Sequence, residues 1–295
     1  MSAQNKKNVL FIINPKAGTR PKNHIPKKIK AYFDIDKFAF SIKMTTHKGH
    51  ASRMAHEATD KYDLIVACGG DGTVNEVAKA VIGTSAVLGI IPLGSGNGLA
   101  RELGLSMSIR KSLEIIQNGR IKMIDVGRVN DLYFINSFSL GLTNDIAITF
   151  DKLGIRGLLG YSISLCKHLF NNKFTELQIE NEGVTQKLKV RTFDIFNIAQ
   201  FGYNFKFLPW VTPFDGQLHL LSFYQLNWFS AMGMLLKIKL GKTVLYKHSL
   251  RLAFDKITIR HSEDFAQIDG DCIRLEGSTL SVQCLPQKLA VIVPF

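Results

Sequence analysis

Residues 63–73 read Asp-Leu-Ile-Val-Ala-Cys-Gly-Gly-Asp-Gly-Thr, an apolar run followed at once by three glycines in four positions. The apolar run is typical of a buried strand. Glycine loses more conformational freedom on folding than any other residue, so this cluster predicts a sharp turn that another group approaches closely. Asp71 places one carboxylate at that point. The segment therefore predicts a strand-to-helix junction suited to a nucleotide phosphate chain and its metal ion.

The residues around this junction alternate between strand and helix patterns, which predicts a parallel sheet with right-handed crossovers in a first domain, residues 1–122. Ligands of such sheets bind beyond the carboxyl ends of the strands. The predicted strands are 8–13, 38–44, 63–68 and 86–91, and the predicted helices are 26–33, 49–59, 74–83, 98–104 and 109–117.

From residue 123 to 295 the pattern changes to alternating polar and apolar residues, which predicts a mostly antiparallel β-sandwich domain. Its last strand, within 287–295, can pack back on the first domain. Helices are expected at 155–170 and 227–238. The predicted strands are 174–180, 187–198, 217–224, 250–254, 257–261, 265–269, 279–284 and 289–293.

Composition limits the function classes without choosing one. The chain has 295 residues and a formal net charge of +13, which attracts nucleic acid, anionic lipid surfaces or phosphorylated small molecules. Its four cysteines show no zinc or disulfide spacing. The start resembles no signal peptide, and no segment reaches the roughly 18 apolar residues of a membrane span. We expect a cytoplasmic protein whose membrane contact is peripheral.

Two more predicted strand ends carry special loops. Residues 14–18 read Asn-Pro-Lys-Ala-Gly, in which Lys16 offers a positive charge, although a plain strand-to-helix turn explains them equally well. Residues 92–98 read Pro-Leu-Gly-Ser-Gly-Asn-Gly and repeat the glycine-rich theme of 69–73 one strand further on. Two such loops on neighbouring strands favour a phosphate site, with Asp71 holding or orienting Mg²⁺.

Helix capping explains part of these loops. Thr73 and Glu76 have the spacing of a capping box, in which each side chain binds a backbone amide near the other. Asn97 is a favoured N-cap residue for the helix that follows it. Capping does not require Gly69, Gly70 or Asp71. The loop can therefore bind phosphate even if Thr73 and Glu76 cap the following helix.

Together these loops resemble the diacylglycerol kinase catalytic-domain family, which includes bacterial lipid kinases and sphingosine kinases. The resemblance rests on NPKAG (14–18), GGDGT (69–73), GSGNGLAREL (94–103), PFDGQL (213–218) and QIDGD (267–271). It covers nearly the whole chain. It implies an α/β nucleotide domain, a β-rich lipid-substrate domain, and ATP-dependent phosphorylation of a lipid hydroxyl with Mg²⁺ at a membrane surface.

The resemblance also implies roles for individual residues. Asp269 matches the base that takes the proton from the lipid hydroxyl, a role that in sphingosine kinases often goes to the residue matching Asp71. Asp71, Asp215 and Asp271 are the expected metal ligands, although Asp271 stands where the family usually has Glu. Asp145 is either the reader of the lipid head group or a solvated loop residue. The expected nucleotide-site residues are Asn14, Lys16, Gly18, Thr45, Gly69, Gly70, Asp71, Gly72, Thr73, Glu76, Ser95, Gly96, Asn97 and Arg101.

Several alternatives stay open. NAD kinase shares the GGDGT loop, and Asn75-Glu76 keeps that assignment in play. A catalytically weak lipid-binding member is another alternative. A nucleic-acid binder is a third, but no RNA-binding signature appears, so we expect no nucleic-acid partner. Residues 153–161 and 228–242 combine apolar groups with lysines, which suits either an anionic membrane surface or core packing. The oligomeric state, a homodimer included, is not readable.

Overall fold

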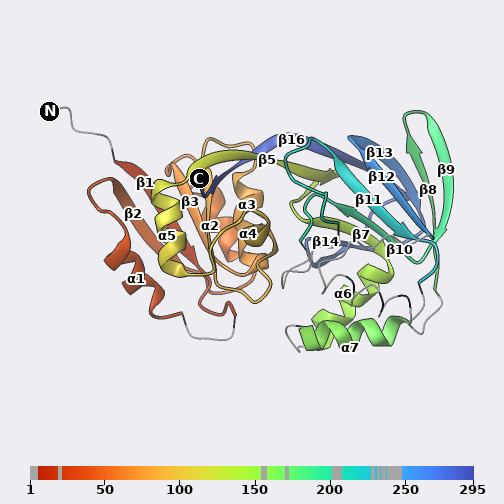
Figure 1. Cartoon of the computed structure of the whole chain (residues 1–295), viewed down its shortest axis with the longest axis horizontal. Coiled ribbons are helices and arrows are strands. Elements are labelled where there is room, and N and C mark those ends of the chain that lie inside the picture. Colours follow the sequence, from red (N-terminus) through yellow and green to blue (C-terminus); the bar gives the residue numbers. More distant parts are fainter. Residues whose placement is uncertain are drawn as a thin grey trace. The chain divides into compact units, whose positions relative to one another are not determined.

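The structure is a computed structural model of the chain. It describes residues 6–18, 22–153, 158–169, 173–200, 208–226 and 248–295, together with Ser230, Gly233 and Lys237. The chain divides into two compact units between Ile124 and Asp125, and the residues from Gln287 onward belong to the first unit (Figure 1). Most of the predicted helix at 227–238 lies outside the described residues.

The first unit is built on a parallel sheet, as predicted. Its strand order is β2-β1-β3-β4, and the end of β16 (Thr279–Val293) adds a further parallel strand, with Val291 opposite Leu88. The other strands are β1 (Lys7–Ile13), β2 (Phe38–Met44), β3 (Leu64–Gly69) and β4 (Val87–Pro92). The carboxyl ends of these four strands therefore share one edge, where the three glycine loops follow.

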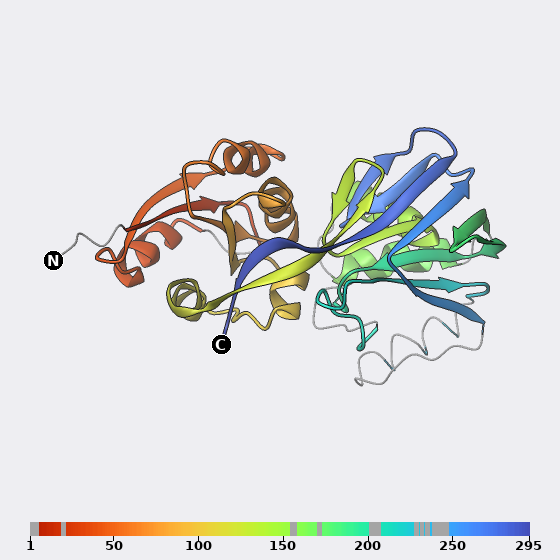
Figure 2. The same cartoon turned by 90° about the horizontal axis from the view of Figure 1, so that it is seen from above.

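Helices cover both faces of this sheet (Figure 2). Helices α1 and α5 bury apolar side chains against one face, in a core that includes Phe11 and Val66 of the strands. Helix α3 packs on β3 and β4, with α2 beside it. The helices are α1 (Ile25–Tyr32), α2 (His50–His56), α3 (Asp71–Val81), α4 (Gly98–Glu102) and α5 (Ile109–Asn118).

The second unit contains two antiparallel sheets. One has the order β16-β13-β8-β9 and the other β12-β11-β10-β7-β14-β15. Side chains from both sheets form one core, with Ile179 and Ile259 from the first and Phe138 and Phe193 from the second. The strands are β5 (Arg120–Val129), β6 (Leu132–Phe134), β7 (Ser137–Gly141), β8 (Thr175–Asn181), β9 (Val184–Val190), β10 (Thr192–Phe196), β11 (Leu218–Phe223), β12 (Ser249–Phe254), β13 (Lys256–His261), β14 (Phe265–Ile268) and β15 (Asp271–Arg274).

Helices α6 (Leu142–Leu153) and α7 (Leu158–Leu169) complete the described part of this unit. Helix α6 packs on β7, β10, β14 and β15 (Figure 1). Among the described residues, no helix is long and apolar enough to cross a bilayer.

Three expectations about the second unit were wrong. Residues 187–198 form two strands rather than one, because the chain passes from the β8–β9 sheet to the β7–β10 sheet at Arg191. The expected separate strands 279–284 and 289–293 are one continuous strand, β16. Asp145 lies in α6 and not in a loop, because that helix starts directly after Gly141, whose φ of 75° turns the chain without a connecting segment.

Candidate functional site

The three glycine loops of the first unit pack backbone against backbone. A Cβ atom added to Gly94 would lie 2.5 Å from the Cα of Gly70, and one added to Gly18 would lie 2.4 Å from the carbonyl oxygen of Leu93. Neither neighbour can move away easily, because both are main-chain atoms. These glycines are therefore required by the contact between the loops themselves.

Gly72 is different. A Cβ atom at Gly72 would meet no protein atom within 4 Å, and the residue is exposed in the first turn of α3. Protein packing does not require a glycine here. The open space lies beside the unpaired amides that begin an eleven-residue helix, which is where a phosphate group binds favourably.

Asp71 ties the two glycine-rich loops together. Its carboxylate accepts hydrogen bonds from the backbone amides of Asn97 (2.8 Å) and Gly98 (2.6 Å). Asn97 occupies the N-cap position of α4 but makes no capping bond, which corrects the prediction made from its residue type. Its side chain returns to Gly94 instead, accepting from the amide (3.0 Å) and donating to the carbonyl (2.8 Å). At the start of α4 the side-chain acceptor is instead Asp71, which binds the amides of Asn97 and Gly98.

The predicted capping box of Thr73 and Glu76 is also wrong. Helix α3 starts at Asp71, three residues earlier than such a box requires, and its N-cap residue Gly70 has no side chain. Thr73 accepts a 3.0 Å hydrogen bond from the Asn14 amide group at the end of β1. Glu76 reaches across to α2.

The partners of Glu76 are backbone amides in the first turn of α2. Its carboxylate accepts from Gly49 (2.9 Å), Ala51 (3.1 Å) and Ser52 (3.3 Å). Glu76 thus caps a helix that begins 26 residues earlier in the chain. Glu76 therefore supports the loop that follows β2.

The other predicted nucleotide-site residues lie at the same sheet edge. Lys16 is exposed, and its amide donates to the Asn14 side chain at 2.9 Å. Thr45 is buried after β2, with its amide bonded to the Ile13 carbonyl at 2.8 Å. Ser95 is exposed, and Arg101 donates to the Gly96 carbonyl at 2.9 Å. The structure thus gathers the loops after β1, β2, β3 and β4 in one place.

In the second unit, Asp269 is held by the connection between β6 and β7. Its carboxylate accepts from the backbone amides of Ile135 (3.1 Å), Asn136 (2.7 Å) and Ser137 (3.2 Å). Its own backbone is left-handed, with φ of 53°, and its amide donates to the Ser137 carbonyl at 2.9 Å. One oxygen, Oδ1, takes part in all three side-chain contacts.

Two residues that sequence reasoning missed support this connection. Asn197 is fully buried and donates 2.9 Å hydrogen bonds to the carbonyls of Asp125 and Ile135. The buried Asp125 carboxylate accepts from the amide of Gly216 at 2.7 Å. The available signal was a single polar residue inside an apolar run, as in Ile124-Asp125-Val126 and Phe196-Asn197-Ile198.

The remaining predicted metal ligands have other partners. Asp215 pairs with His219 at 3.0 Å and accepts from the amide of Gln217 at 3.1 Å. Asp271 begins β15, opposite Ile268. Within the described residues, no three histidine, cysteine or acidic side chains gather as a metal cluster. A Mg²⁺ ion held by one carboxylate together with phosphate oxygens needs no such cluster, and Asp71 fits that arrangement because each of its oxygens has a second lone pair.

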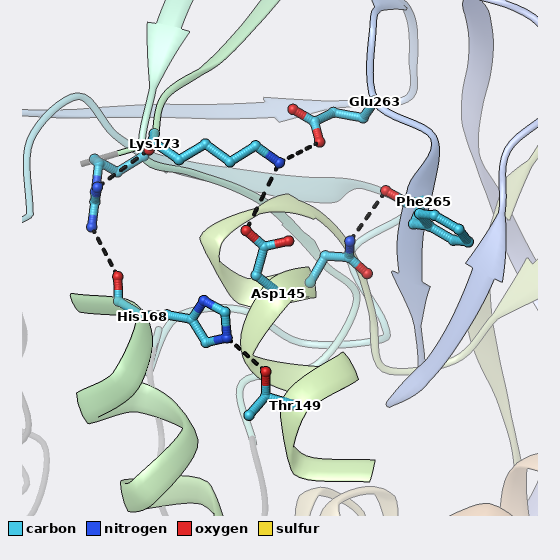
Figure 3. A network of polar contacts seen from close by, with 8 residues as sticks. Asp145, Thr149, His168, Lys173, Glu263 and Phe265 are labelled. Carbon is cyan, nitrogen blue, oxygen red and sulfur yellow. Dashed lines mark hydrogen bonds and ion pairs between the residues drawn. The ribbon is translucent and has the colours of Figure 1, made fainter. Parts of the chain in front are cut away.

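Asp145 sits in an ionic network between α6, α7 and the strands (Figure 3). Lys173 lies 3.9 Å from Asp145 and 3.4 Å from Glu263, and a cavity of about 10 Å³ lies between Asp145, His168 and Lys173. Burial raises the pKa of Asp145, and the nearby charges of Lys173 and His168 lower it again in part. Asp145 is therefore a half-buried, ion-paired helix residue.

Asp194, which sequence reasoning also missed, is a buried acid on β10. Burial raises its pKa to about 6, partly offset by the nearby hydroxyls of Ser139, Thr143 and Thr192. Its sequence signal was again a lone polar residue, in Phe193-Asp194-Ile195.

Comparison with known proteins agrees with this architecture. Residues 8–129 match the model of the diacylglycerol kinase catalytic domain. The chain is 29% identical over 275 residues to a diacylglycerol kinase of Bacillus subtilis, covering 90% of both proteins. It is also 29% identical over 292 residues to a probable lipid kinase, YegS-like, of Klebsiella pneumoniae, covering 97% of this chain and 95% of that protein.

Solved structures share the fold. A diacylglycerol kinase structure from Bacillus anthracis superposes with a TM-score of 0.74 at 21% identity, covering 98% of this chain and 97% of that one. An NAD kinase from Archaeoglobus fulgidus, solved in complex with ATP, reaches 0.56 at 12% identity, covering 96% and 93%. Residues 8–129 thus match the diacylglycerol kinase catalytic-domain family, and relatives named diacylglycerol kinase or lipid kinase align with nearly the whole chain.

Proposed function

We propose that this protein is an ATP-dependent lipid kinase that transfers the γ-phosphoryl group of ATP to a lipid hydroxyl at a membrane surface. The observation that carries the proposal is Gly72. Within the 69–73 loop, Gly72 is the glycine whose added Cβ atom would meet no protein atom within 4 Å. It lies at the start of α3, in one of the loops whose backbones pack against each other. Similarity to diacylglycerol and lipid kinases supplies the reaction class.

The first unit supplies the nucleotide groups. The amides that begin α3 and the exposed Lys16 offer positive partners for phosphate oxygens. Mg²⁺, bound by Asp71 and the phosphates, would neutralise charge that develops during transfer. Phosphoryl transfer depends mainly on positioning and charge neutralisation, so a rigid loop assembly of this kind suits it.

The second unit supplies the proposed base. Asp269 would accept the proton of the lipid hydroxyl as that oxygen attacks the γ-phosphorus. Three backbone amides fix the orientation of its carboxylate, and positioning of this kind is what general-base catalysis requires. Asp71, whose two oxygens each accept from an amide of the neighbouring glycine loop, is assigned to the metal ion in this proposal.

The lipid class and the membrane contact are further parts of the proposal. A net charge of +13 favours an anionic lipid surface. In the two segments expected to meet the bilayer, residues 154–157 and nearly all of 228–242 lie outside the described residues. We propose Asp145 as a head-group contact, which requires that its ion pair with Lys173 open or be shared with the lipid.

NAD kinase is the alternative to exclude. Incubating the protein with γ-labelled ATP, Mg²⁺ and either NAD or a panel of diacylglycerol, monoacylglycerol and sphingoid lipids separates the two activities. We expect label in an organic-extractable phospholipid product. Label in NADP, with none in any lipid, would overturn the proposal.

A further inference from the structure

Asn197 directly follows strand β10 and is fully buried. Its side-chain nitrogen Nδ2 donates 2.9 Å hydrogen bonds to the carbonyl oxygens of Ile135 and Asp125. Its backbone amide donates a third bond, also of 2.9 Å, to the carbonyl of Asn136. Because both hydrogens of Nδ2 are bonded to main-chain carbonyls, the orientation of the side chain is fixed.

Two of these carbonyls belong to peptide groups whose N–H ends hold Asp269. The Ile135 carbonyl shares a planar peptide group with the Asn136 N–H, which donates to Asp269 Oδ1 at 2.7 Å. The Asn136 carbonyl shares the next peptide group with the Ser137 N–H, which donates to the same oxygen at 3.2 Å. In a trans peptide group the C=O and N–H bonds point in opposite directions. Asn197 therefore holds one side of two consecutive peptide groups, and Asp269 binds their other side.

The side chain of Asn197 controls the first of these peptide groups. The bond from its backbone amide to Asn136 is independent of the side chain, whereas the bond to Ile135 comes from Nδ2. The 135–136 peptide group gives Asp269 the shortest of its amide bonds. Hydrogen bonds in line polarise one another, so the bond at the carbonyl end strengthens the N–H end. Without Nδ2 this peptide group can tilt, and the carboxylate that it holds would tilt with it.

The second bond of Nδ2 anchors the side chain to the 213–216 loop. Its acceptor is the carbonyl of Asp125, whose carboxylate accepts from the Gly216 amide at 2.7 Å and whose own amide donates to the Pro213 carbonyl at 2.9 Å. The oxygen of the side chain, Oδ1, is buried and lacks a hydrogen-bond partner among the described residues. The contribution of Asn197 to its surroundings therefore comes through its nitrogen.

We propose that Asn197 is a positioning residue for Asp269. Through the 135–136 peptide group it fixes the direction in which the carboxylate of the base faces the lipid hydroxyl. The inference rests on the proposed function, in which Asp269 takes the proton of that hydroxyl. It adds a fully buried residue that sets the rate of transfer through another side chain, without contact with the lipid or ATP.

A double-mutant cycle tests whether Asn197 acts through Asp269. The rate measured is the transfer of label from γ-labelled ATP, with Mg²⁺, to a lipid that the wild type phosphorylates. Asn197→Ala should lower kcat about tenfold or more, because small displacements of a catalytic group have large effects on rate. It should leave the KM for ATP unchanged, since the contacts of Asn197 described above lie within the second unit. In the Asp269→Asn background, where the base is already lost, the same substitution should change kcat by less than about twofold.

Ser222→Ala is the matched control. Ser222 is also fully buried in the second unit, and its hydroxyl donates to the Thr192 carbonyl at 2.6 Å. Alanine there removes a buried side-chain hydrogen bond to a carbonyl, as it does at Asn197, but one that involves none of the peptide groups at 135–137. It should lower the melting temperature and keep kcat within about twofold of the wild type.

Asn197→Ser is the milder variant, since its hydroxyl keeps one donor in place of two. Its kcat should lie between those of Asn197→Ala and the wild type. It completes the same cycle with Asp269→Asn if the alanine variant does not fold.

Equal fold-losses of kcat in the wild-type and Asp269→Asn backgrounds would overturn the inference, because Asn197 would then act independently of the base. Wild-type kcat in Asn197→Ala would overturn it too, as would an equal loss in Ser222→Ala. Each of these results would leave the kinase proposal standing. No transfer by the wild type to any lipid of the panel would remove the proposed function, and this inference with it.

Discussion

The backbone amide of Gly98 donates a 2.6 Å hydrogen bond to the carboxylate of Asp71, 27 residues earlier in the chain. The second carboxylate oxygen accepts from Asn97 at 2.8 Å. One acidic side chain thus fixes the loop after β4 to the loop after β3. The acid inside the Gly-Gly-Asp-Gly-Thr segment of this chain therefore connects two loops.

Asp71→Asn should weaken ATP binding about tenfold or more. An amide side chain accepts through only one atom, and its NH₂ group would face a backbone N–H, so a charge-assisted hydrogen bond is lost. We expect a loss of about 1.5–3 kcal/mol in the free energy of unfolding as well. Calorimetric titration with ATP and urea denaturation measure the two effects.

Asp63→Asn is the matched control for that variant. Asp63 accepts a 2.7 Å hydrogen bond from the Asn8 amide at the opposite end of β3. It should lose some stability but keep ATP affinity. If both variants bind ATP like the wild type, the loop connection is not part of a nucleotide site.

Alanine substitutions at two glycines should have opposite consequences. Gly94→Ala places a methyl group 2.5 Å from the Gly70 backbone, so it should destabilise the fold by several kcal/mol. Gly72→Ala meets no protein atom and replaces glycine by a better helix former, so its melting temperature should be equal or higher. It should nevertheless bind ATP at least about tenfold more weakly, because the methyl group occupies the space proposed for phosphate. Unchanged ATP affinity in Gly72→Ala would exclude that space as the phosphate position.

Glu76→Ala should lower the free energy of unfolding by about 1–2 kcal/mol, because the first turn of α2 loses the carboxylate that accepts three of its amides. Glu57→Ala, at the other end of the same helix, should change stability by less than about 0.5 kcal/mol. Urea denaturation compares the two. Equal stabilities would show that the cap contributes nothing measurable.

Asp194 predicts a specific pH dependence of stability. Its pKa in the folded protein is about 6, above the ordinary value of 3.8. Between those values the folded protein retains a proton that the unfolded chain has released, so the contribution of Asp194 to stability falls as pH rises through this window. Asp194→Asn should therefore gain stability relative to the wild type between pH 4.5 and 7.5, on the order of 1–3 kcal/mol. A difference that stays constant with pH would contradict the assignment.

The parts of the site that sequence reasoning predicted are those with local signals. A glycine cluster directly after an apolar run marks a strand end, and parallel strands bring their carboxyl ends to one edge. The loops at 14–18, 69–73 and 94–98 could therefore be placed together without knowing any long-range contact. The structure adds that packing between the loops explains Gly18, Gly70 and Gly94, whereas it leaves Gly72 unexplained.

The errors arose where a local rule competed with a distant partner. Thr73 and Glu76 have capping-box spacing, but Glu76 binds amides of α2 more than twenty residues away. Asn97 has the right residue type for an N-cap, but its side chain bonds to Gly94. Its backbone amide donates to the distant Asp71 carboxylate. Asp194, Ser139 and Gln267 lie opposite one another because of the register of three strands that are separated by dozens of residues, and no local pattern specifies that register.

The central claim is that Asp269 is the base of the proposed phosphoryl transfer. Asp269→Asn tests it with limited structural disturbance, because asparagine tolerates the left-handed backbone of this position and its oxygen can replace Oδ1, which accepts from all three amides. Only the second contact of the Ile135 amide, with Oδ2 at 3.1 Å, is lost. Asp269→Ala, which loses those contacts, is expected to be unstable as well as inactive.

The decisive measurement is the rate at which Asp269→Asn transfers label from γ-labelled ATP to a lipid that the wild type phosphorylates, with ATP affinity and melting temperature determined on the same sample. We predict a rate lower by about 10²–10⁴-fold, with ATP affinity and melting temperature close to those of the wild type. Transfer at the wild-type rate would contradict the account.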